Sequence, residues 1–142
     1  TESPYGHYVL GTIAAQGKDV AAAERHYADV FRLAGTDTVY RDVVQNSRAQ
    51  LEVLSAQRVR GLAESGDFTA ILADAGRYDD QTLVQAGVYA SQAKKNDDAI
   101  KLFAAALEKN PYQRDALHNL ASTYYMTNQF DKIVPLVERL VA

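Results

Sequence analysis

The chain has 142 residues, and its 15 Lys and Arg against 18 Asp and Glu give a formal net charge of −3. With 47% hydrophobic and 23% charged residues, the composition is typical of a folded globular protein and argues against a disordered one. The absence of cysteine excludes disulfides, thiolate metal sites and a cysteine nucleophile, while the acidic balance offers no basic footprint for nucleic acid.

Residues 4–37 predict the first pair of helices. They match a later stretch of the chain at an offset of 76, which places Gly11 on Gly87 and Tyr27 on Phe103. Glycine on a buried helix face allows two helices to approach closely, and an aromatic residue can fill the space beside it. We therefore expect Gly11 to be a packing glycine and Tyr27 to lie in the core.

Residues 38–79 form the irregular part of the chain. A capping cluster at residues 36–38 precedes a stretch without Gly or Pro that ends at Gly61, which predicts one helix of roughly 25 residues. A turn at residues 64–68 then leads into a short helix over Phe68 to Ala75, which stops at Gly76. The long helix is expected to face inward with Val43, Val44, Leu51, Leu54, Val59 and Leu62. Two interpretations stay open: a degenerate unit with a lengthened first helix, or an insertion that packs on a partner.

Residues 80–113 and 114–142 superpose at an offset of 34, and each predicts two helices. The buried stripes of the first copy are Leu83, Ala86, Gly87 and Ala90, followed by Ala99, Leu102, Phe103 and Ala106. Asp97 is expected to cap the second helix of this copy, and Asn110-Pro111 to end it. Pro135 is tolerable in the last helix only if that helix begins close to it.

This pattern resembles the tetratricopeptide repeat family. The matching residues are Leu83, Ala86-Gly87, Ala90, Ala99, Phe103, Ala106 and Pro111. The resemblance covers 80–142 well and 4–37 fairly well, but it is weak over 38–79, and no Trp opens any unit. It implies an all-α, right-handed superhelix of about eight antiparallel helices, a single array over residues 1–142 with units at about 4–37, 38–79, 80–113 and 114–142.

Signals for catalysis or metal binding are weak in the sequence. His7, His26 and His118 form no HExxH pair, and without cysteine a zinc site would need an unusual set of carboxylates. The acidic pairs at 79–80 and 97–98 fall at helix starts, where they complement the helix dipole. We therefore predict no catalytic residue, no metal and no cofactor, and a protein that is not an enzyme.

The resemblance implies that the first helix of each unit lines a concave surface that binds a partner. Carried onto this chain, that surface comprises Tyr5, Tyr8, Thr12, Gln81, Val84, Val88, Asp115, His118, Asn119, Ser122 and Tyr125. Aromatic residues with Asn, Gln and Ser are suited to peptide binding, although the tyrosines could instead merely cover helix flanks. The surface carries no cationic clamp, so binding of a chaperone's C-terminal carboxylate is not expected.

The predicted function is a protein–protein interaction scaffold, an assembly or structural subunit of a larger complex, including a membrane-extrinsic one. The alternatives are a transient peptide-binding receptor module and a regulatory module of a larger multidomain enzyme. The expected partner is a protein or peptide, with no nucleic acid and no membrane insertion, although docking on a membrane-bound complex fits.

The ends of the chain indicate its context. It begins at Thr1 with neither an initiator methionine nor a leader, and it closes on the apolar Leu140-Val141-Ala142. We therefore expect that a leader was removed or that the segment comes from a longer chain, with at least one more element after it. The sequence predicts a soluble chain and leaves the compartment open.

Overall fold

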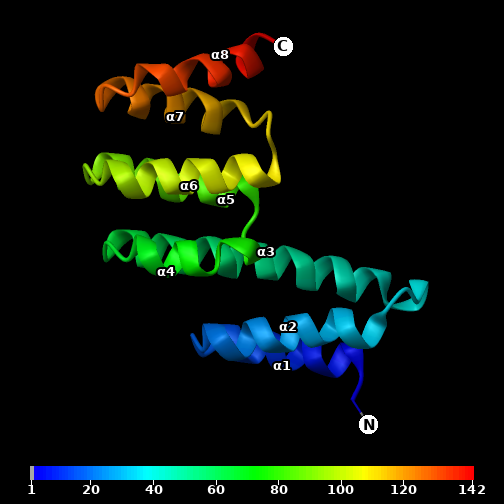
Figure 1. Cartoon of the computed structure of the whole chain (residues 1–142). Helices are drawn as coiled ribbons and strands as arrows, with labels where there is room; N and C mark the ends of the chain where they lie inside the picture. Colours follow the sequence, from blue (N-terminus) through cyan, green and yellow to red (C-terminus); the bar gives the residue numbers. More distant parts are fainter. Residues whose placement is uncertain (1) are drawn as a thin grey trace. The chain divides into compact units, whose positions relative to one another are not determined.

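The computed structural model describes residues 2–142 (Figure 1). Within that range the chain forms eight α-helices, three short 3-10 helices and no strand, which confirms the predicted all-α class. The α-helices are α1 (Pro4–Gln16), α2 (Val20–Ala34), α3 (Arg41–Glu64), α4 (Phe68–Ala73), α5 (Asp80–Gln92), α6 (Asn96–Lys109), α7 (Arg114–Met126) and α8 (Ile133–Val141). Between residues 2 and 142 no helix combines the length and apolar character that crossing a bilayer requires.

All four consecutive helix pairs turn in the same way. Each turn has one residue with a left-handed backbone, and the amide of the next residue donates to the carbonyl five positions back, as in a Schellman motif. The left-handed residues are Lys18, Gly66, Lys94 and Asn128, with φ of 62°, 80°, 60° and 61°. The hydrogen bonds are Asp19 to Ala14, Asp67 to Leu62, Lys95 to Ala90 and Gln129 to Tyr124, at 2.8–2.9 Å. The irregular residues 38–79 therefore contain, between α3 and α4, the same turn as the regular pairs.

The chain divides into two compact units, Thr1–Arg58 (unit 1) and Val59–Ala142 (unit 2), with the boundary inside α3. Each unit is described by itself below. The single array and its right-handed superhelical course stay predictions.

In unit 1, α1 and α2 pack through a glycine and an aromatic ring. Ser3 caps α1 by accepting a hydrogen bond from the Gly6 amide at 3.0 Å, and Asp19 caps α2. Tyr27 is 1% exposed, and a Cβ on Gly11 would stand 2.9 Å from its Cε1 atom. The predicted packing glycine and core tyrosine of this pair are confirmed.

The long helix predicted in the irregular segment is present as α3, which has 24 residues. Each of its six residues expected to face inward is buried or half-buried. Val43, Leu54 and Val59 are buried, and Val44, Leu51 and Leu62 are half-buried. The following helix α4 ends at Ala73, and a 3-10 helix, Ala75–Arg77, continues the chain to the start of the next pair.

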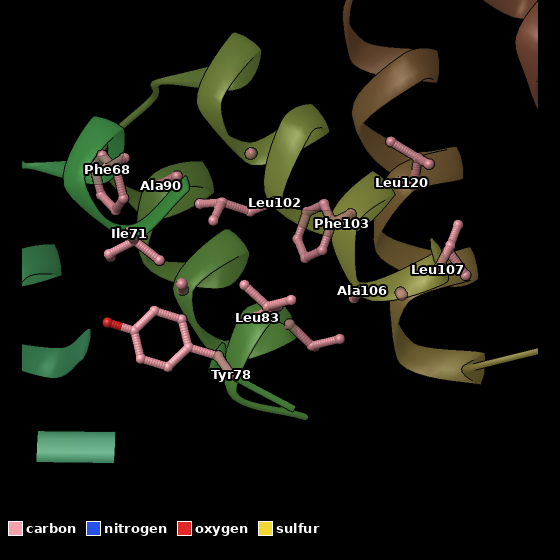
Figure 2. Close-up of a cluster of buried hydrophobic side chains, with 14 of the residues drawn as sticks. Phe68, Ile71, Tyr78, Leu83, Ala90, Leu102, Phe103, Ala106, Leu107 and Leu120 are labelled. Carbon is pink, nitrogen blue, oxygen red and sulfur yellow. The ribbon is translucent and has the colours of Figure 1, made fainter. Parts of the chain in front are cut away.

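Unit 2 has one continuous hydrophobic core, to which α4, α5, α6 and α7 all contribute (Figure 2). Phe68, Leu83, Leu102, Phe103 and Leu117 are each at most 1% exposed. Burying one large apolar side chain contributes about 1.5–3 kcal/mol. The eight positions predicted for the two stripes of α5 and α6 are all buried. The packing of this pair therefore follows the sequence pattern closely.

The helix ends of unit 2 differ from expectation at one position. The N-cap of α6 is Lys95, and Asp97 lies within the first turn, so the prediction that Asp97 caps this helix was wrong. There its negative charge still complements the helix dipole. At the other end Asn110 is the C-cap of α6, as predicted. Pro135 lies in the first turn of α8, where its missing N–H costs little, so this helix begins close to Pro135 as predicted.

Candidate functional site

The predicted binding residues of unit 1 lie along α1, spaced by three and four residues. Tyr5 is 52% exposed, and its hydroxyl donates to the carbonyl of Val39 at 3.3 Å. Tyr8 is half-buried, with its ring 5.9 Å from that of Tyr27. The hydroxyl of Thr12 donates to the carbonyl of Tyr8 at 3.0 Å. Tyr5 thus offers free surface, whereas Tyr8 and Thr12 mainly serve the packing of α1 on α2.

On α5 the three predicted residues have different environments. Gln81 is exposed, and its side-chain oxygen accepts a hydrogen bond from Gln113 at 3.0 Å. Val84 is 4% exposed and belongs to the hydrophobic core, so it presents almost no surface to a partner. Val88 is half-buried and lines a shallow hollow. The other residues around this hollow are Arg60, Gln85, Tyr89 and Gln92.

The five predicted residues of α7 separate into two groups. Asp115 is exposed in the first turn, and the carbonyl of half-buried Asn119 accepts a hydrogen bond from a threonine hydroxyl at 2.8 Å. His118, Ser122 and Tyr125 are all exposed, at spacings of four and three that place them on one helix face. The structure brings these three residues together along one groove.

This groove, the α7–α8 groove, has a volume of ≈ 520 Å³. It is lined by His118, Ala121, Ser122, Tyr125, Met126, Ile133, Val137 and Leu140. Apolar side chains dominate the lining, and Met126 and Val137 are 60% and 43% exposed. An open apolar surface with a few polar groups is typical of a site that binds another molecule.

The α7–α8 groove is the repeat counterpart of a surface that is covered one pair earlier in the chain. An offset of 34 takes His118, Ser122, Val137 and Leu140 onto Val84, Val88, Phe103 and Ala106. Phe103 is 1% exposed because α7 packs there and brings Leu117 and Leu120 into the same core. The positions of Val84, Phe103 and Ala106 are therefore buried in α5 and α6, whereas their counterparts His118, Val137 and Leu140 line the open groove; Val88, the counterpart of Ser122, lines a separate hollow.

Four residues of the groove lining were not among the predicted binding residues: Met126, Ile133, Val137 and Leu140. The offset of 34 placed Val137 and Leu140 at core positions, those of Phe103 and Ala106. The alignment could have indicated this surface. A residue at the position of Phe103 is buried only when a following helix packs over it, and no helix follows α8 among the described residues. The groove becomes visible once the packing of α7 on the preceding pair is known.

Unit 1 contains a polar cluster at the start of α1. The Arg32 guanidinium donates to Glu2 and to Asp29, both at 3.3 Å. These hydrogen bonds, to Glu2 first and then to Asp29, raise the pKa of Arg32 above its ordinary value. A group of three possible metal-ligating side chains lies next to them: His7, His26 and Asp29.

Comparison with known proteins matches part of the chain to a family. Residues 90–140 match the tetratricopeptide repeat model, a range that begins at the end of α5 and includes α6 and α7 and most of α8. No curated protein was found to match the chain. The matched range includes every residue of the α7–α8 groove.

Proposed function

We propose that this protein is an interaction scaffold that binds a helix of a partner protein in the α7–α8 groove, since residues 90–140 match the tetratricopeptide repeat model. Tetratricopeptide repeats generally mediate protein–protein interaction, and their fold is typically non-catalytic. We further propose that the protein is a structural or assembly subunit of a larger complex, because the groove exposes a mostly apolar lining.

One observation carries this proposal: the groove repeats a surface on which a helix is already seated. The seated helix, α7, presents Ala116, Leu117 and Leu120, which are all buried. The spacing of one and three residues puts this small-and-large apolar set on one side of α7. A partner helix with a similar apolar face would bury the open side chains of α7 and α8 in the same manner.

The polar residues of the groove add specificity to this apolar contact. His118 and Ser122 can donate and accept hydrogen bonds, and the exposed ring of Tyr125 offers a large, rigid contact area. The Tyr125 ring is held edge-on against Phe130 with centroids 5.5 Å apart. A ring fixed before binding loses little conformational freedom when a partner docks.

The other predicted binding residues lie outside the groove. Tyr5, Gln81 and Asp115 are exposed and can extend the contact, and Val88 faces a separate hollow. Whether they form one surface with the groove depends on the proposed single array of four units. A transient peptide-binding module and a regulatory module of a larger enzyme are the alternative functions, and docking on a membrane-bound complex is one form of the main proposal.

The test is affinity capture from native extract, including detergent-solubilised membranes, with mass spectrometry of proteins recovered in stoichiometric amounts. The capture is repeated with Val137→Asp, which places a charge in the groove. Its matched control is Val134→Asp on the same helix, because Val134 is 58% exposed and lies outside the groove lining.

We expect the stoichiometric partner to be lost with Val137→Asp and retained with Val134→Asp. Substoichiometric partners that respond to the same variant would favour a transient receptor over a subunit of a stable complex. Equal recovery with both variants would show that binding does not use the groove.

A further inference from the structure

A second cluster with specific chemistry lies in unit 1, and its residues play no part in the α7–α8 groove. His26 and Asp29 are three residues apart on α2, so they lie on the same helix face. His7 reaches the same place from α1. The two helices are held together next to this cluster by the close packing of Gly11 against Tyr27.

The distances in this cluster are close to those of a metal site. The Nδ1 atoms of His7 and His26 are 3.0 Å apart, and the His7 Nδ1 is 3.6 Å from Oδ2 of Asp29. One potential ligand atom from each of the three residues lies within 4.8 Å of the other two. Ligand atoms about 2.0–2.2 Å from a shared ion are separated by about 3–3.5 Å from their neighbours. Small side-chain adjustments would therefore place all three around one ion.

A second carboxylate lies on the other side of the first histidine. The Nε2 atom of His7 faces Oε1 of Glu2 at 3.7 Å, on the opposite side of the ring from Nδ1. When Nε2 carries the proton towards a carboxylate, Nδ1 keeps the lone pair that a metal ion requires. Arg32 engages the other oxygen of Glu2 and Oδ1 of Asp29, which leaves Oδ2 of Asp29 facing the histidines.

A hydrogen bond between the two imidazoles accounts for only part of this arrangement. One proton can join the Nδ1 atoms of His7 and His26, but the Asp29 oxygen at 3.6 Å lies beyond hydrogen-bond distance. A metal ion at this place would engage all three residues together. The His7 side chain is 11% exposed and that of Asp29 is 35% exposed, so water can reach the remaining coordination positions from the Asp29 side.

We propose that His7, His26 and Asp29 bind one divalent transition-metal ion, with Zn²⁺ as the expected ion. Two imidazoles and one carboxylate suit zinc and its neighbours in the first transition row, whereas Mg²⁺ and Ca²⁺ prefer sites made of oxygen alone. The ion would join α1 to α2 and stabilise this helix pair. The proposal is independent of the scaffold function, because its ligands all lie in unit 1.

The test uses the full, tag-free chain and the metal ions themselves. Co²⁺ is titrated as a probe, because its visible absorption reports imidazole ligation, and Zn²⁺ binding is measured by calorimetry and by thermal unfolding. We expect one Zn²⁺ per chain and a melting temperature that rises with Zn²⁺ concentration. NMR shifts of the imidazole nitrogens should move at the Nδ1 atoms of His7 and His26.

Three variants distinguish specific Zn²⁺ binding at this cluster from adventitious binding elsewhere on the chain. His26→Gln and Asp29→Asn remove one ligand each, and we expect Zn²⁺ affinity to fall by about tenfold or more. Glu2→Gln removes the carboxylate that lies 3.7 Å from Nε2 of His7, and it should weaken binding less than either ligand variant does. The control is His118→Gln in unit 2, which should leave affinity unchanged.

Circular dichroism without metal checks that each variant folds, and two independent ligand variants keep the test valid if one of them unfolds. Absence of Co²⁺ absorption with excess ion would overturn the proposal. Zn²⁺ binding that survives both ligand variants, or that is lost in His118→Gln, would also overturn it.

Discussion

The ring of Phe103 lies in the space that a side chain on Gly87 would need. A Cβ atom at Gly87 would stand 2.5 Å from Cε1 of Phe103, closer than such atoms come in proteins. The pair in unit 1 repeats this relationship between Gly11 and Tyr27, at 2.9 Å. The absent side chain and the large ring therefore form one complementary contact between paired helices.

Gly87→Ala should destabilise the protein even though alanine favours helix formation. The added methyl would displace the Phe103 ring, and overpacking of this kind costs about 1–3 kcal/mol. Gly61→Ala is the matched control, because a Cβ there meets open space among the described residues and alanine stabilises a helix by up to about 1 kcal/mol. Urea unfolding measures both, and equal effects would contradict this account of Gly87.

Phe103→Ala should cost about 3–5 kcal/mol, because it leaves a cavity at the centre of the unit 2 core. Tyr112→Ala removes an aromatic ring that is 63% exposed, and its effect should stay within about 0.5 kcal/mol. Thermal unfolding of the two variants gives the comparison. A Phe103→Ala melting temperature close to that of Tyr112→Ala would remove Phe103 from the core.

Lys94→Gly should stabilise the protein by up to about 1 kcal/mol. Lys94 has a φ of 60°, and a left-handed backbone costs an L-residue about 1–2 kcal/mol, which glycine avoids at some entropic cost. Asn128→Gly at the equivalent turn should gain less, since asparagine tolerates this conformation better. Denaturant midpoints should rank the two variants in that order, and a lower midpoint for Lys94→Gly would contradict the prediction.

Tyr8→Ser and Tyr125→Ser should have opposite consequences. The half-buried Tyr8 packs on Tyr27, so its loss should destabilise unit 1. Tyr125 is 66% exposed, so its replacement should leave stability nearly unchanged while weakening partner binding. Melting temperature and affinity capture together test this, and a large loss of stability in Tyr125→Ser would assign that residue to the core.

The helix pairs and their packing could be predicted because each contact joins residues close in sequence. Gly87 and Phe103 are 16 positions apart, and both fall on stripes with clear helical spacing. The turns were harder to predict, because a Schellman turn depends on backbone hydrogen bonds and accepts Lys, Gly or Asn at its left-handed position. The turn predicted at residues 64–68 is nevertheless present, and it has the same hydrogen bond as the other three although the resemblance over residues 38–79 is weak.

The candidate sites could be predicted only in part, because they depend on which faces other helices cover. Val84 and His118 occupy equivalent positions, yet one is buried in the core and the other lines the groove. His7 and His26 are 19 positions apart, and no motif joins them in the sequence. They meet only because α1 and α2 pack at the separation that Gly11 allows.

The weak anchoring of α8 has a consequence for the lifetime of the protein in the cell. Among the described residues of this helix, Leu136 alone is buried, and its N-cap residue Lys132 makes no side-chain capping hydrogen bond. Such a helix opens at low energetic cost, and proteases cleave chains in their open state. A partner that fills the α7–α8 groove would hold α8 closed. We therefore expect unassembled copies to be degraded faster than assembled ones, so that the abundance of the protein follows that of its partner.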